Sequence, residues 1–92
     1  RISMWSGDGS QFIRSVPVKY QPNCLTIGHF HRMIVGFNYK IEVYEMTNFN
    51  QIQSFGSYGE KPGQLNQIYG MCVTDDNNLI VSDYFNHRIQ IF

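Results

Sequence analysis

One closely spaced pair of histidines could form a metal site in this sequence. His29 and His31 lie one residue apart in GHFHR, and imidazole is the commonest zinc ligand in proteins. No acidic or thiol residue stands at ligand spacing beside them. A solvated turn explains the pair without an ion, so we expect no metal site.

Nucleophilic catalysis would need a nucleophile, a base within reach and a third group that orients the base. Serines and aspartates occur along the chain, but none stands in a motif with such a mechanism. We therefore expect no catalytic residue, no cofactor and no enzyme activity in these residues.

An acidic and a basic residue, Asp83 and Arg88, bracket a turn between two apolar runs. Their simplest role is a structural brace, in which a carboxylate at the end of one strand pairs with a guanidinium at the start of the next. An exposed pair is worth ~0–1 kcal/mol, which would fix the turn more than the fold. The alternative role for these residues is direct contact with a partner.

Composition limits the class of protein. The chain has 92 residues, of which 42% are hydrophobic and 15% aromatic, and its formal net charge is +0. This suits one small packed domain, and it supplies no overall field to attract nucleic acid or a membrane. Cys24 and Cys72 stand in apolar runs, where we expect free, buried thiols in a reducing compartment, the cytoplasm. The first residues do not resemble a signal peptide, and a start at Arg1 suggests a piece of a longer protein.

The chain repeats itself. A shift of 39 places residues 1–16 on residues 40–55 without a gap. A shift of 46 places QPNCLTI on QIYGMCV, and a shift of 48 places FNYKIEVY on FNHRIQIF. The second copy has seven extra residues within SYGEKPGQLN and gains Asp83 and Tyr84 later. The register changes only in polar, Gly-rich or Pro-rich stretches, where insertions are tolerated.

Each repeated piece reads as a short strand. The pieces are rich in Ile, Val, Phe, Tyr and Thr, alternate apolar and polar residues, and are bounded by turn residues such as SGDGS and TDDNN. Lettered a to d by place in the repeat, the predicted strands are c 1–5, d 12–16, a 24–27, b 33–36, c 40–44, d 51–55, a 71–74, b 79–82 and c 88–92. The sequence thus predicts an all-β fold of antiparallel four-stranded blades, as in a β-propeller.

A family resemblance appears in residues 55–92. The stretch FGSYGEKPGQLNQIYGMCVTDDNNLIVSDYFNHRIQIF resembles an NHL repeat, on Phe55, Gly56, Gly59, Pro62, Gly63, Gln64, Gly70, Asp83, Asn86, His87, Arg88 and Ile89. The earlier copy departs from the pattern, with Cys24 at the opening Gly, Gly36 near the strand-ending Asp, and Tyr39-Lys40 in place of His-Arg. The resemblance implies an incomplete arc of about two blades, with a c–d hairpin in 1–16, a full degenerate blade in 24–55 and strands a to c of the next blade in 71–92.

The resemblance also implies a function. NHL propellers often stand at the C-terminus of tripartite-motif ubiquitin ligases, where a RING transfers ubiquitin and the propeller selects the substrate, or in RNA regulators. A non-catalytic recognition module for a protein partner is therefore expected. The alternative is binding of single-stranded RNA. A fragment of a propeller lyase or hydrolase is a third reading, but strands 24–27 and 71–74 lack the carboxylates and histidines of such sites.

The d–a and b–c loops should emerge together on one face of the propeller. They carry aromatic, amide and basic side chains, which suit protein hot spots and also stacking on single-stranded bases. The bland alternative is that these rings pack between blades. The predicted partner-binding face consists of Lys19, Tyr20, Asn23, Asn38, Tyr39, Lys40, Lys61, Tyr69, Tyr84, Phe85, His87 and Arg88. The opposite face, residues 28–32 and 74–78, offers less apolar area and ranks second.

Overall fold

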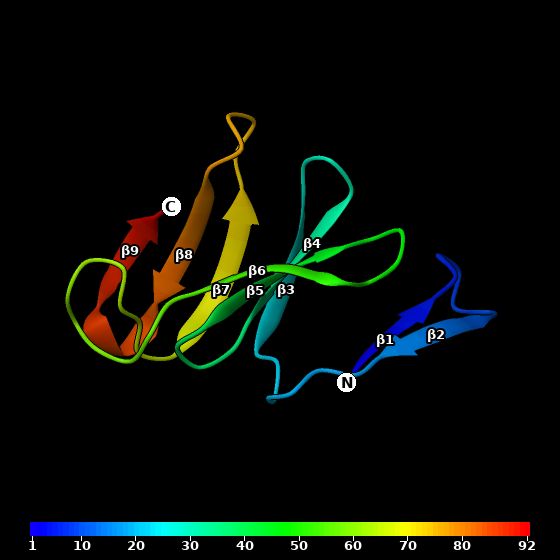
Figure 1. Ribbon diagram of the computed structural model, residues 1–92, viewed down its shortest axis with the longest axis horizontal. Coiled ribbons are helices and arrows are strands. Elements are labelled where there is room, and N and C mark those ends of the chain that lie inside the picture. The colour runs from blue at the N-terminus through cyan, green and yellow to red at the C-terminus, as the bar shows by residue number, and fades with distance from the viewer.

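The computed structural model describes residues 1–92 and consists mostly of short β-strands (Figure 1). These strands form three antiparallel sheets of two, four and three strands that stand in a row. The predicted all-β class, with antiparallel blade-like sheets, is confirmed. No helix is long and apolar enough to cross a bilayer.

The first sheet pairs β1 (Ile2–Trp5) with β2 (Phe12–Val16) through the turn SGDGS. Oδ1 of Asp8 accepts hydrogen bonds from the hydroxyl and the backbone N–H of Ser10 and from the hydroxyl of Ser6. These bonds lower the pKa of Asp8 to about 2. Carboxylates that bond nearby backbone groups stabilise turns, which explains why this stretch forms a hairpin.

The second sheet has the strand order β3-β4-β5-β6. Its strands are β3 (Cys24–Gly28), β4 (Arg32–Gly36), β5 (Ile41–Glu45) and β6 (Gln51–Phe55). Each pairs with the next along the chain in antiparallel register, so the sheet has the meander of one propeller blade.

The third sheet repeats the first three strands of this order. Its strands are β7 (Ile68–Val73), β8 (Leu79–Asp83) and β9 (Arg88–Ile91), and a 3₁₀ turn, η1 (Tyr84–Asn86), joins β8 to β9. β7 begins three residues earlier than predicted, because Ile68 still pairs with Asp83 across a bulge at Tyr69. The other eight strands lie within one residue of the predicted bounds.

The main core lies between the second and third sheets. Its buried side chains are Ile34, Ile41, Val43, Leu65, Ile68, Leu79 and Val81. At Gly36, an added Cβ atom would lie 2.9 Å from Sγ of Cys24 in the same sheet and 3.1 Å from Ile68 in the third sheet. Glycine at this position therefore permits the close packing of the two sheets.

The other face of the second sheet carries a smaller cluster. Met33, Val35, Phe37 and Tyr44 are buried there, with Ile2 and Val18 packed against them. Glu42 is also buried, with 4% of its surface exposed, and accepts a 2.5 Å hydrogen bond from the Tyr44 hydroxyl. Burial, followed by this bond and the charge of Glu42, raises the pKa of Tyr44 well above its usual value.

The two cysteines differ in environment. Both are free; Cys24 is half-buried, and burial raises the pKa of its thiol. Cys72 is exposed, so the prediction that it is buried was wrong. The reason is that side chains alternate between the two faces of a strand. Met71 pairs with Val81, which is buried toward the second sheet, so the next residue, Cys72, paired with Ile80, lies on the face turned away from that sheet.

Candidate recognition face

The loops between sheets and the β4–β5 and β8–β9 loops within sheets gather along one edge of the molecule. Segments 17–23, 37–40, 56–67 and 84–87 lie at this edge, and the β3–β4 and β7–β8 turns lie at the opposite one (Figure 1). Every residue predicted for partner binding is on the first edge or at the strand ends beside it.

The histidine pair lies at the opposite edge. Nε2 of His29 stands 3.0 Å from the carbonyl oxygen of Thr74, which joins the β3–β4 turn to the β7–β8 turn. His31 has a positive φ of 56° in the same turn. No three His, Cys, Asp or Glu side chains come together at a distance that could hold a metal ion.

Three of the predicted residues form an exposed cluster, the aromatic triad of Tyr69, Tyr84 and Phe85. The rings of Tyr69 and Tyr84 stack with centroids 5.3 Å apart, and Phe85 meets Tyr84 edge-on at 5.1 Å. Their exposed fractions are 71%, 52% and 57%. The bulge in β7 leaves Tyr69 outside the ladder, and η1 presents the other two rings beside it. These rings therefore do not pack between the described sheets.

Asp83, at the end of β8, directly precedes Tyr84 of this cluster in the chain and is fully buried. Its Oδ1 accepts the backbone N–H of Asn66 at 2.8 Å. Its Oδ2 accepts Nε of Arg88 at 2.8 Å, Nδ2 of Asn86 at 2.9 Å and Nε2 of Gln90 at 3.1 Å. We call this arrangement, Asp83 with its four donors, the Asp83 brace.

Four of the five N–H groups of the Arg88 guanidinium are also engaged. Besides Nε, its Nη1 donates to the carbonyl of Glu60 at 2.8 Å, and Nη2 donates to the carbonyls of Lys61 at 3.0 Å and Gln64 at 2.9 Å. Arg88 therefore fixes the β6–β7 loop and has little capacity left for a partner. The energy expected from the sequence for an exposed ion pair is too low for this interaction, since the Asp83 side chain has no exposed surface.

Competing effects set the charge state of Asp83. Burial raises the pKa of its carboxyl, but the hydrogen bonds from Asn66, Asn86 and Arg88 and the positive charge of Arg88 outweigh burial. The pKa therefore lies below its ordinary value, and Asp83 is a carboxylate at neutral pH.

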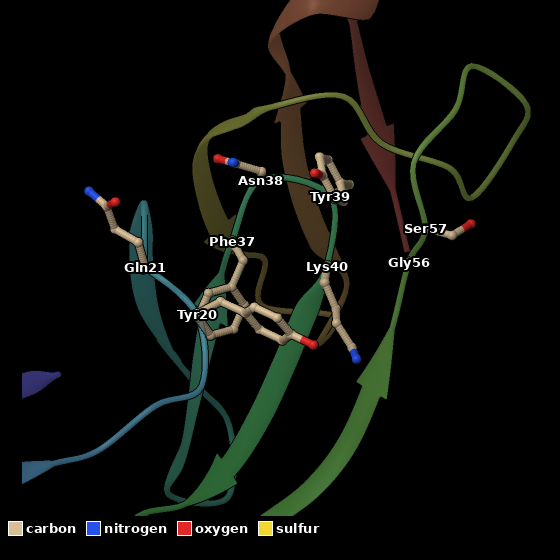
Figure 2. A pocket seen from close by; sticks show the side chains of 8 residues that line it. All are labelled: Tyr20, Gln21, Phe37, Asn38, Tyr39, Lys40, Gly56 and Ser57. Atoms are coloured by element: carbon tan, nitrogen blue, oxygen red, sulfur yellow. The ribbon is translucent and has the colours of Figure 1, made fainter.

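A second group of predicted residues lines a cavity of about 420 Å³, here called the Tyr20 pocket (Figure 2). Its lining consists of Tyr20, Gln21, Phe37, Asn38, Tyr39, Lys40, Gly56 and Ser57. Tyr20 meets Phe37 edge-on at 5.7 Å, and Nζ of Lys40 lies 5.7 Å from the Tyr20 ring centroid. Lys19 flanks the same ring at 5.6 Å. Such distances allow a cation–π attraction.

The remaining predicted residues have other surroundings. Nδ2 of Asn23 donates to Oδ1 of Asn38 at 2.9 Å and to the carbonyl of Ile68 at 3.2 Å, so it links the two blades. His87 takes a left-handed conformation and ends η1, with its N–H bonded to the Tyr84 carbonyl. Lys61 is exposed on the β6–β7 loop.

Sequence reasoning missed several residues of both sites. Gly56 and Ser57 line the pocket, and Gln64 and Gln90 complete the contacts of the brace with its loop. Gly56 belongs to the FG pair of the repeat, which was a usable signal. Gln64 belongs to the PGQ segment of the repeat, which was also a signal, but nothing in the sequence marked Gln90, 26 positions further on.

Antiparallel sheets in a row, each with the meander of a blade, define the chain as an arc of β-propeller type. The family model of the NHL repeat matches residues 65–92, which confirms the resemblance there. "Protein brain tumor" of Drosophila melanogaster is 47% identical over 38 residues, which cover 41% of this chain and 4% of that protein. "Protein wech" of the same organism is 32% identical over 53 residues, 56% of this chain and 6% of that protein. The chain thus spans a small fraction of either relative.

Proposed function

We propose that this chain is a non-catalytic recognition module that binds a protein partner through the loop edge. The aromatic triad carries the proposal. Tyr84 packs against both Tyr69 and Phe85, and the three exposed rings together form an apolar surface of the kind found at the energetic centre of protein interfaces. In this proposal, residues 1–16, 24–55 and 71–92 are parts of consecutive blades, and further blades close the ring.

Peptides selected from a displayed random library on the immobilised chain provide the test. Tyr84→Ala should weaken the selected peptides at least about tenfold, as expected for a hot-spot residue. Phe30→Ala is the matched control, because Phe30 is 73% exposed but lies in the β3–β4 turn at the opposite edge. Selected peptides that bind both variants as well as the unchanged chain would refute the proposal.

Single-stranded RNA is the second candidate. Lys19, Lys40 and Lys61 share the loop edge with exposed rings, and lysines beside aromatics suit phosphates beside bases. Binding of an oligouridylate would then weaken steeply with salt, with a logarithmic slope of about 0.7 per phosphate contacted. Affinity that is insensitive to salt would exclude this function.

The whole protein is proposed to be a tripartite-motif-type ubiquitin ligase in the cytoplasm, with this arc in its substrate-selecting domain. The NHL match supports that role, and two free thiols suit a reducing compartment. Reading the transcript outward from this segment tests it. Paired Cys/His zinc spacings and a coiled coil upstream are expected, whereas a signal peptide would contradict the proposal.

A further inference from the structure

The Tyr20 pocket and the Asp83 brace occupy corresponding places in two copies of the repeat. The shift of 48 places Asn38 on Asn86 and Lys40 on Arg88, and the shift of 46 places Tyr20 on Asn66. In the later copy, Nδ2 of Asn86, Nε of Arg88 and the N–H of Asn66 are three of the four groups that donate to the Asp83 carboxylate. The earlier copy therefore retains the donor positions of a carboxylate site.

The earlier copy lacks the carboxylate itself. Gly36 runs directly into Phe37, where the later copy inserts Asp83 and Tyr84, and the preceding loop is seven residues shorter. No internal group takes the place of the missing acid. Lys40 forms no ion pair and no side-chain hydrogen bond, and the N–H of Tyr20 bonds to nothing in the chain. The side chain of Asn38 uses only its Oδ1, which leaves its Nδ2 free.

Tyr20, Asn38 and Lys40, the residues that carry these free donors, all line the Tyr20 pocket. We propose that the pocket binds an aspartate or glutamate side chain of a protein partner, which supplies the carboxylate that Asp83 supplies within the later copy. This proposal rests on the recognition role proposed above and names the chemistry of one contact.

The surroundings favour a carboxylate over a nucleotide. A base needs the free face of a ring, but Tyr20 is flanked by two lysines and abuts Phe37, and Tyr39 meets Tyr58 edge-on at 5.3 Å. Lys40 in the pocket lining and Lys19 beside the Tyr20 ring offer a point of positive charge, not a track for successive phosphates.

Glu42 is the acidic residue of the earlier copy that could occupy this site from within the chain. It corresponds to Gln90, which donates to Asp83 in the later copy. Glu42 is buried, accepts the Tyr44 hydroxyl and does not line the pocket. One donor of the later copy is therefore lost, but three remain.

Nuclear magnetic resonance titration of the 92-residue chain tests the proposal. The probes are N-acetyl-aspartate methylamide, its asparagine counterpart and an oligouridylate. We expect the aspartate probe to give saturable shifts at the Tyr20 N–H and the Asn38 side-chain amide, and the asparagine probe to bind at least about tenfold more weakly, as the loss of a charged hydrogen bond predicts.

Variants of one lysine provide the control. Lys40→Gln should abolish the shifts and Lys40→Arg should retain them, whereas Arg14→Gln, at an exposed basic residue of β2 outside the pocket and the predicted face, should change nothing. Equal binding of both amino-acid probes, no shift with either, persistence in Lys40→Gln, or preference for the oligouridylate would each overturn the proposal.

The two proposals fail separately. A negative titration with intact dependence of selected peptides on Tyr84 would remove the carboxylate contact and leave the recognition role. A positive titration with no dependence on Tyr84 would leave a carboxylate pocket and remove the aromatic triad as the recognition surface.

Discussion

The charge of Asp83 is stable in a fully buried position because four donors, one of them the guanidinium of Arg88, surround it. Asp83→Asn keeps the volume but sets an amide NH₂ against these donors and leaves Arg88 without its counter-charge. We expect the free energy of unfolding to fall by about 2–4 kcal/mol, as on breaking a largely buried pair. Urea denaturation followed by circular dichroism measures this. Asp8→Asn, in an exposed turn, should cost less, and an equal loss would contradict the argument.

The same carboxylate makes stability depend on pH. Because the folded pKa of Asp83 lies below its ordinary value, its contribution is fully present above pH ~4, the unfolded pKa, and is lost as pH falls through the lower folded pKa. Denaturation at a series of acidic pH values should show this decline, and Asp83→Asn should flatten it. A variant that declines as steeply as the unchanged chain would place the titration elsewhere, for example at Asp8.

Among the connecting elements, the exit from β6 depends on Gly56. Its φ is +97°, and a Cβ atom there would lie 3.0 Å from both Cδ1 of Leu65 and the Tyr39 carbonyl oxygen. We expect Gly56→Ala to cost about 1–3 kcal/mol, from backbone strain and from displacement of the buried Leu65. Gly63→Ala is the matched control, since Gly63 has a φ of +84° with no atom within 4 Å of the added Cβ. Equal losses in thermal denaturation would mean that strain alone acts.

The repeat supplies a test of packing on the scale of the whole molecule. Ile41 and Ile89 hold the same place in their copies, but Ile41 is fully buried between sheets and Ile89 is 70% exposed. Ile41→Ala should cost about 2–5 kcal/mol, and Ile89→Ala less than about 0.5 kcal/mol. Chemical denaturation of both variants measures the difference. Similar costs would mean that the face of Ile89 is also covered in solution.

Much of the architecture was predictable because strands with one apolar face alternate apolar and polar residues in the sequence, and the repeat indicated the order of the strands. The burial of Asp83 was not, because it depends on carbonyls of residues 60, 61 and 64, which only the folded loop brings to Arg88. The exposure of Cys72 was missed because an apolar run does not say which of its faces finds a neighbouring sheet. The Tyr20 pocket depends on a difference in loop length, and its consequence in space cannot be read from the residues alone.

Because of that difference in loop length, the donors of a blade either hold its own loop in place or stay open to a partner. A donor that is bound within the chain is closed to outsiders, as at Arg88, and a donor left open, as at Lys40, gives up the internal bond that would hold its loop. Loop exchange should therefore convert one state into the other. Moving the seven extra residues and the Asp83-Tyr84 pair into the earlier copy should close the Tyr20 pocket with an internal carboxylate. Removing them from the later copy should open a second pocket of the same kind. The scaffold can thus be tuned in valency, blade by blade, without redesign of its strands.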